Sequence, residues 1–318
     1  MDIMAGRRLP FCLSLLISGL GFGVLGSVFA WQAKQDFRPD DQKDAPPVFR
    51  ASVDLVVVPV TVTDRLNRYI VDLEAEHFQV FENKVEQEIL YFGTGKSPVS
   101  VGFILDISGS MQDNILSARN SIIRFLEQGD PRDEFFLVTF NNRTAIAQDF
   151  TPRGSNVRDK IAFADPKGST ALFDAVYVGL EKMRDAMHPK RALIVVTDGE
   201  DNASRYTFSE VREMARESPV QIYVIGERGE IGYGAAVIKE LVKISGGRPF
   251  FPTSLQQLDY FADLIHTELR SQYMLGYRST DRRRGDGWRK IKVKLNPSED
   301  LPQKLRLRHK PGYVPSKF

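Results

Sequence analysis

The segment 100-SVGFILDISGS-110 places an apolar run directly before an Asp-x-Ser-x-Ser motif. A second segment, 192-ALIVVTDG-199, runs in the same way from apolar residues into Thr197-Asp198-Gly199. Such near-continuous apolar runs predict strands of a parallel sheet that helices bury on both faces. Open α/β sheets form their ligand sites at the carboxyl ends of these strands. Both segments therefore carry oxygen-bearing side chains to the same edge of one sheet.

Outward from these two segments, strands alternate with amphipathic helices from residue 98 to residue 270. This alternation predicts an α/β fold with a doubly wound, mostly parallel sheet flanked by helices, similar to a Rossmann fold. We expect the strands at Ser100–Ile107, Glu134–Phe140, Ala192–Thr197, Val220–Gly226 and Arg248–Pro252. We expect the helices at Asn114–Glu127, Ala171–Met187, Phe208–Glu217, Ala235–Ile244 and Leu255–Arg270.

The candidate metal ligands are the oxygen side chains that meet at this edge. A third contribution comes from 168-GST-170, where a loop before a helix can bring the Thr170 hydroxyl to the same place. The full candidate set is Asp106, Ser108, Ser110, Thr170 and Asp198. Glu200 and Asp201 follow closely, but we interpret them as acidic loop residues and leave them out of the site.

An all-oxygen ligand set suits a hard cation, and Mg²⁺ takes six oxygens at about 2.0–2.1 Å. We expect the three hydroxyls to bind directly and the two aspartates to act largely through water. The ion would then lack a direct anionic ligand from the protein, so a carboxylate from a partner protein is the natural sixth ligand. We predict Mg²⁺, and Mn²⁺ or Ca²⁺ remain alternatives.

On these residues the chain resembles the von Willebrand factor type A (VWFA) family over roughly residues 98–270. That family's metal-ion-dependent adhesion site (MIDAS) has the pattern Asp-x-Ser-x-Ser, a distant Thr and a distant Asp before Gly, and all five positions are present. The wider layout is similar to the exported bacterial VWFA-related proteins, including a Tyr-x-Leu-Gly-Tyr-like segment, here 273-YMLGY-277. The resemblance implies metal-dependent protein binding or adhesion and no established catalysis.

The N-terminus has the features of an export signal. Arg7-Arg8 precedes an apolar run from Leu9 to Ala30, and a cut after Ala30 fits signal-peptidase chemistry. The same run is long enough to remain as an uncleaved membrane anchor. Both alternatives place the folded part outside the cytoplasm, either secreted or periplasmic. The only cysteine, Cys12, lies in this segment, so the exported part can form no disulfide.

A polar linker at 31–49 and two short β-rich flanks, 50–97 and 271–318, surround the α/β domain. The expected strands there are Val53–Thr63, His77–Phe81, Glu88–Phe92, Tyr273–Tyr277, Ile291–Leu295 and Leu305–Arg308. Neither flank is large enough to bury a core alone. We therefore hypothesise that the N-terminal β module and the C-terminal β segment pair into one small β-sandwich-like module.

Other functions are less well supported by the sequence. None of the four histidines stands beside a strand-end serine in a G-x-S-x-G elbow, so a metal-dependent hydrolase is a minor alternative. The segment from Ser271 holds 13 Lys or Arg against 4 Asp or Glu, which we interpret as a solvated strand face and not a nucleic-acid or lipid contact. The main alternative is a cell-envelope scaffold or assembly factor whose metal is structural. The sequence does not define the partner or the oligomeric state.

Overall fold

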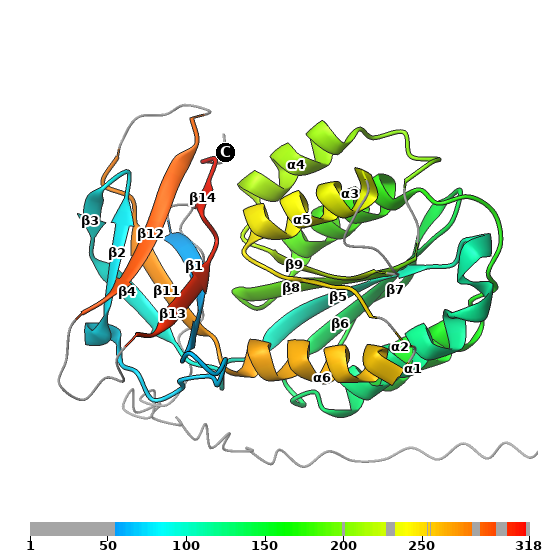
Figure 1. The fold of residues 1–318 in the computed structure, drawn as a ribbon, viewed down its shortest axis with the longest axis horizontal. Helices are drawn as coiled ribbons and strands as arrows, with labels where there is room; N and C mark the ends of the chain where they lie inside the picture. The colour runs from blue at the N-terminus through cyan, green and yellow to red at the C-terminus, as the bar shows by residue number, and fades with distance from the viewer. Residues whose placement is uncertain are drawn as a thin grey trace, which may run out of the picture. The chain divides into compact units, whose positions relative to one another are not determined.

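The structure, a computed structural model, describes residues 55–198, 201–226, 233–252, 254, 256–281, 287–296 and 304–315. These residues form a helix-covered six-stranded sheet and two four-stranded sheets (Figure 1). The expected leader at 1–30 and linker at 31–49 lie outside the described residues. Among the residues described, no helix combines the length and apolar character that a membrane span requires.

The six-stranded sheet has the order β10-β9-β8-β5-β6-β7. Its neighbouring strands are parallel except for β7, which pairs with β6 in the antiparallel sense at one edge. All eight residues of β5 are buried, as its apolar sequence predicts. The strands are β5 (Val99–Asp106), β6 (Glu134–Phe140), β7 (Thr144–Thr151), β8 (Lys190–Thr197), β9 (Gln221–Gly226) and β10 (Pro249–Phe250).

Helices cover both faces of this sheet. Figure 1 shows α1, α2 and α6 on one face and α3, α4 and α5 on the other. Phe125 and Ile265 belong to the hydrophobic core of the first face, and Val176 and Val211 belong to that of the second. The helices are α1 (Ile115–Glu127), α2 (Gly154–Ala162), α3 (Leu172–Lys182), α4 (Phe208–Glu217), α5 (Tyr233–Ser245) and α6 (Gln256–Arg270).

The predicted doubly wound fold is confirmed, but within it one strand and one α-helix were not predicted, and one predicted helix ends earlier than expected. The edge strand β7 and the helix α2 were not predicted. Both are half exposed and lack the long apolar runs that identify buried elements. The helix expected to reach Met187 ends at Lys182, followed by a 3₁₀ turn at Met183–Asp185. Ala186, which follows this turn, is already extended.

The two flanks combine into a β-sandwich, which confirms the hypothesised module. One sheet has the order β13-β1-β11-β4 and the other the order β14-β12-β2-β3, with antiparallel pairing throughout. N-terminal and C-terminal strands therefore alternate in the first sheet, and in the second sheet the C-terminal strand β12 pairs with the N-terminal strand β2. The strands are β1 (Leu55–Thr63), β2 (Phe78–Glu82), β3 (Val85–Gln87), β4 (Ile89–Gly93), β11 (Tyr273–Arg278), β12 (Arg289–Leu295), β13 (Arg306–His309) and β14 (Gly312–Tyr313).

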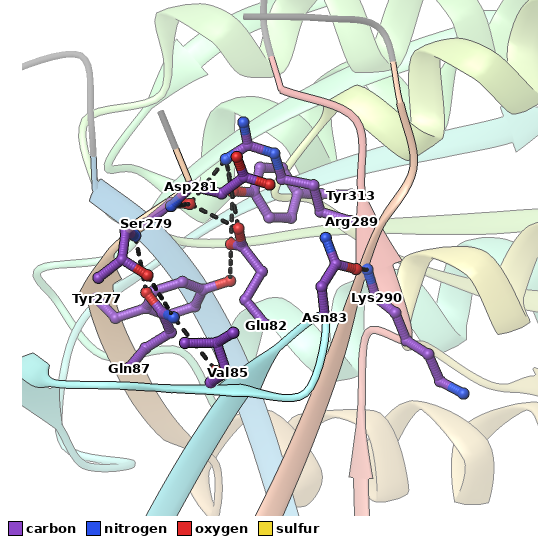
Figure 2. Close-up of polar contacts among 11 residues, drawn as sticks. Glu82, Asn83, Val85, Gln87, Tyr277, Ser279, Asp281, Arg289, Lys290 and Tyr313 are labelled. Carbon is purple, nitrogen blue, oxygen red and sulfur yellow. Dashed lines mark hydrogen bonds and ion pairs between the residues drawn. The ribbon is translucent and has the colours of Figure 1, made fainter. Parts of the chain in front are cut away.

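A buried carboxylate ties the two sheets of the sandwich together (Figure 2). Glu82, only 2% exposed, accepts hydrogen bonds from the hydroxyls of Tyr277 at 2.8 Å, Tyr313 at 2.9 Å and Ser279 at 2.6 Å. Arg289 adds an ion pair at 3.3 Å. Tyr277 belongs to one sheet, whereas Glu82, Arg289 and Tyr313 belong to the other.

Polar contacts also join the sandwich to the α/β domain. Lys310, which follows β13, donates from Nζ to the carbonyl oxygens of Ala215 and Arg216 at 3.0 Å and of Ser218 at 2.5 Å. These carbonyls lie at the C-terminal end of α4, where cations are favoured. Burial lowers the pKa of Lys310 to about 7. Arg308 pairs at 2.5 Å with Glu268 of α6.

Candidate metal centre

The carboxyl ends of β5 and β8 lie next to each other, because the two strands are parallel neighbours with Leu105 opposite Val196. Asp106 is the last residue of β5 and is fully buried. Its Oδ2 accepts a hydrogen bond from Thr197 Oγ1 at 2.6 Å, and its Oδ1 accepts one from the Ser108 backbone amide at 2.8 Å. Hydrogen bonds from Thr197, the last residue of β8, and from Ser108, which follows β5, therefore hold the Asp106 carboxylate in one orientation.

Burial makes the negative charge of the Asp106 carboxylate unfavourable. Burial raises its pKa above the usual value, while the hydrogen bonds from Thr197 and Ser108 act in the opposite direction. Loss of hydration outweighs these hydrogen bonds, because a buried carboxylate without an opposite charge is unfavourable. A divalent cation beside it would supply that opposite charge.

The two serines of the Asp-x-Ser-x-Ser motif connect Asp106 to Asp198. Ser108 Oγ and Ser110 Oγ are 3.1 Å apart, and Ser110 Oγ donates to Asp198 Oδ1 at 2.8 Å. Ser108 is the residue before a 3₁₀ turn at Gly109–Asp113, and Ser110 lies within that turn. Ser108 is buried and Ser110 is exposed, so the cluster opens toward solvent on the Ser110 side.

Thr170 reaches the same edge through backbone contacts of its loop. The Gly109 amide donates to the Gly168 carbonyl at 2.9 Å, and the Lys167 amide donates to the Ile107 carbonyl at 2.8 Å. Gly168 has a φ of +83°, and a Cβ there would lie 2.9 Å from Asn142 Oδ1, so this turn requires glycine. Thr170 itself is 3% exposed. The structure thus places the five predicted residues at the end of β5, on the loops that follow β5 and β8, and on the loop before α3.

The residues that support these loops are not among those predicted from the sequence. Asn202 Oδ1 accepts a hydrogen bond from the Thr170 amide at 2.9 Å. Asp201, which we interpreted as an acidic loop residue, accepts one from the Phe173 amide at 3.2 Å, so it supports the start of α3. Glu200 lies outside the described residues. One local feature points to this support: Ala171 occupies the N-cap of α3, and alanine has no side chain that can cap the helix.

The donor chemistry fits a hard divalent cation. The cluster consists of two carboxylates and three hydroxyls, and such oxygen ligands are preferred by Mg²⁺, Mn²⁺ and Ca²⁺. Within the described part of the chain, no group of three or more His, Cys, Asp or Glu side chains is arranged to hold a metal ion. A metal at this edge would therefore depend on the serine and threonine hydroxyls.

The four histidines make their contacts elsewhere. His77 Nδ1 accepts from the Glu74 amide, and His188 Nε2 lies 2.9 Å from the Arg132 carbonyl. His266 packs edge-on against Phe125. His309 Nε2 accepts from the Val293 amide. None of these contacts involves the five candidate ligands, so the geometry offers no serine–histidine pair at the strand ends.

Comparison with known families gives one match. The model of the von Willebrand factor type A domain matches residues 100–264, just over half of the chain. The inter-alpha-trypsin inhibitor heavy chain H4 of Sus scrofa is 24% identical over 192 residues, which cover 54% of this chain and 21% of that protein. The Homo sapiens protein of the same name is 25% identical over 171 residues, covering 49% and 18%. The chain thus spans about a fifth of the length of these relatives.

Solved structures share the fold. A von Willebrand factor type A protein from Catenulispora acidiphila superposes with a TM-score of 0.50 and 13% identity, covering 70% of this chain and 52% of that chain. Proximal thread matrix protein 1 from the mussel byssus, solved with zinc in its own MIDAS motif, gives a TM-score of 0.45 and 19% identity over 58% of this chain and 48% of that chain. At these identities the likeness concerns the fold alone.

Proposed function

The chain belongs to the von Willebrand factor type A domain family, and from this premise we propose that it recognises a protein partner through a bound divalent metal, Mg²⁺. Asp106, Ser108, Ser110, Thr170 and Asp198 would hold the ion. The observation that carries the proposal is the series of hydrogen bonds that links the buried Asp106 to the Ser108 backbone amide, the Ser108 hydroxyl to the exposed Ser110 hydroxyl, and Ser110 to Asp198.

This arrangement suits recognition because its two sides differ. The buried side carries the Asp106 carboxylate, which a cation would stabilise, and the Ser110 side faces solvent. When bound, the metal supplies a fixed positive centre that accepts an oxygen ligand from outside the chain. An Asp or Glu carboxylate is the partner group of matching charge and hardness. We therefore infer a binding role and no catalytic one.

The proposed location follows from the N-terminal sequence. The apolar run at 9–30, cleaved or retained as an anchor, directs the folded part outside the cytoplasm. The domain then meets its partner in the secreted or periplasmic space. Neither nucleic acid nor a lipid surface is needed for this function, apart from a membrane contact through a retained anchor.

A scaffold role is the second candidate, favoured by the junction between the sandwich and the α/β domain. Lys310 and Arg308 fasten β13 to α4 and α6, so the two parts are joined by buried polar contacts. A rigid junction of this kind suits a protein that holds others in place. In this role the metal would stabilise its loops and partner binding would persist after chelation.

Calorimetric titration of Mg²⁺ into the chelator-treated protein tests the proposal. We expect one saturable site that Asp106→Ala and Thr170→Ala remove while the circular dichroism spectrum is unchanged. Ser169→Ala is the matched control, because Ser169 is an exposed hydroxyl next to Thr170 that is not a proposed ligand. Absence of Mg²⁺ binding by the folded wild type would refute the metal-dependent function, and partner capture that survives chelation would favour the scaffold.

A further inference from the structure

The loop that follows Asp198 holds the backbone of Thr170 from both sides. The Thr170 amide donates to Asn202 Oδ1 at 2.9 Å. The Thr170 carbonyl accepts from the Asn202 amide at 3.0 Å and from the Ala203 amide at 3.2 Å. Both backbone polar groups of Thr170 are therefore bound by Asn202 or its neighbour. The loops of two proposed ligands, Thr170 and Asp198, are joined at this point.

The same loop also caps helix α3, which begins two residues after Thr170. Asp201 Oδ1 accepts from the Phe173 amide at 3.2 Å, and Ser204 Oγ accepts from the Asp174 amide at 3.0 Å. In return, Asp174 Oδ1 accepts from the Arg205 amide at 2.8 Å. The first amides of α3, which Ala171 cannot cap, are thus bound by residues about thirty positions later in the sequence.

Fixing the backbone of Thr170 also restricts its hydroxyl. Threonine is branched at Cβ, so few side-chain rotamers are accessible once its backbone torsions are set. A metal site depends on such support, because groups that orient the ligands contribute to affinity although they do not touch the ion. Asn202 is exposed and its side chain is not among the proposed ligands, so its effect on the metal would pass through Thr170.

We propose that Asn202 is a positioning residue of the metal centre, which orients the Thr170 hydroxyl by clamping the Thr170 backbone. The inference rests on the proposed Mg²⁺ site and deepens it. It makes the metal affinity depend on the Asp198 loop twice, once through Asp198 itself and once through the Asn202 clamp. By the reciprocity of linked equilibria, bound Mg²⁺ must in turn stabilise the hydrogen bonds between the two loops.

Titration of Mg²⁺ into purified Asn202 variants tests the role. Asn202→Ala removes the acceptor for the Thr170 amide, and we expect Mg²⁺ binding to weaken by about tenfold with little change in the unfolding midpoint. Asn202→Asp keeps an acceptor oxygen and is expected to restore binding. Asn120→Ala, an exposed asparagine of α1, is the matched control and should bind like the wild type.

Amide hydrogen exchange of the wild type gives an independent readout that needs no variant. The Thr170 amide should exchange more slowly when Mg²⁺ is added, because the ion stabilises the clamp. Unchanged Mg²⁺ affinity in Asn202→Ala, no rescue by Asn202→Asp, or unchanged Thr170 exchange on metal binding would each overturn the positioning role and leave the proposed function standing. No Mg²⁺ binding by the wild type would overturn both.

Discussion

Replacing Glu82 by alanine should destabilise the β-sandwich strongly. The Glu82 side chain accepts four hydrogen bonds, from Tyr277, Tyr313, Ser279 and Arg289, at 2.6 to 3.3 Å. Alanine removes this shared acceptor together with the negative charge that pairs with Arg289, a side chain only 9% exposed. Both sheets of the sandwich lose the contact that links them in Figure 2.

The magnitude follows from burial and from the number of partners. Removing one member of a buried ion pair costs about 3–5 kcal/mol. The negative charge of Asp281 also acts on Arg289 and offsets part of this cost. Each hydroxyl that loses its acceptor adds to this, although Ser279 still accepts from Arg289 Nη1 at 2.7 Å. We therefore expect the free energy of unfolding to fall by about 4 kcal/mol in Glu82→Ala. Glu82→Gln keeps one acceptor oxygen and should lose about half as much.

Urea unfolding followed by circular dichroism measures this loss, with Glu88→Ala as the control. Glu88 is an exposed carboxylate between β3 and β4, and its removal should change the free energy of unfolding by about 0.5 kcal/mol or less. Mg²⁺ titration below the unfolding range should give the wild-type affinity, because Glu82 lies in the other module. If Glu82→Ala unfolds within about 1 kcal/mol of Glu88→Ala, the network is not the clamp between the sheets.

Three further predictions concern the metal centre and the β-sandwich. Asp106→Asn should abolish Mg²⁺ binding in calorimetry yet melt no lower than the metal-free wild type, because burial raises the pKa of Asp106 and its charge is unfavourable there. Gly168→Ala should weaken Mg²⁺ binding and lower the free energy of unfolding by about 1 kcal/mol, since φ is +83°, whereas Gly287→Ala has open space and should do neither. Burial lowers the pKa of His309 below 6.5 in the folded protein. As the pH falls, His309 of the unfolded chain is therefore protonated at a higher pH than His309 of the folded chain. Urea unfolding should therefore show stability decreasing below about pH 6.5, and His309→Gln should reduce that slope.

The sequence predicted the fold wherever local pattern and burial coincide. The strands β5 and β8 were recognisable because each is a continuous apolar run, and both are buried along almost their whole length. The edge strand β7 was missed because polar and apolar side chains are mixed along it and seven of its eight residues are exposed or half-exposed. Its pairing with β6 shifts register twice, so no regular alternation marks it in the sequence.

In the candidate site, too, the residues of one short motif were predictable, whereas contacts between residues distant in sequence were not. Asp106, Ser108 and Ser110 lie within one strand end, and the motif alone indicated them. The support that Asn202 and Asp201 give to Thr170 and Phe173 joins residues about thirty positions apart. Nothing in the spacing of these residues identifies the contact. The missing N-cap at Ala171 was the one local sign that a capping group must come from elsewhere.

The structure explains why the residues of the segment 273-YMLGY-277 are needed, which the sequence pattern alone does not. The Tyr273 hydroxyl donates to the Ile70 carbonyl at 2.9 Å and accepts from the Leu73 amide at 3.0 Å, 200 residues away in sequence. Gly276 must be small, because a Cβ there would lie 2.8 Å from the Tyr91 Cβ. Together with the Tyr277–Glu82 bond, these contacts fasten the C-terminal strand β11 into the N-terminal module. The pattern therefore reflects the assembly of the sandwich, whereas the residues that we propose for recognition lie at the ends of β5 and β8 and on the loop before α3.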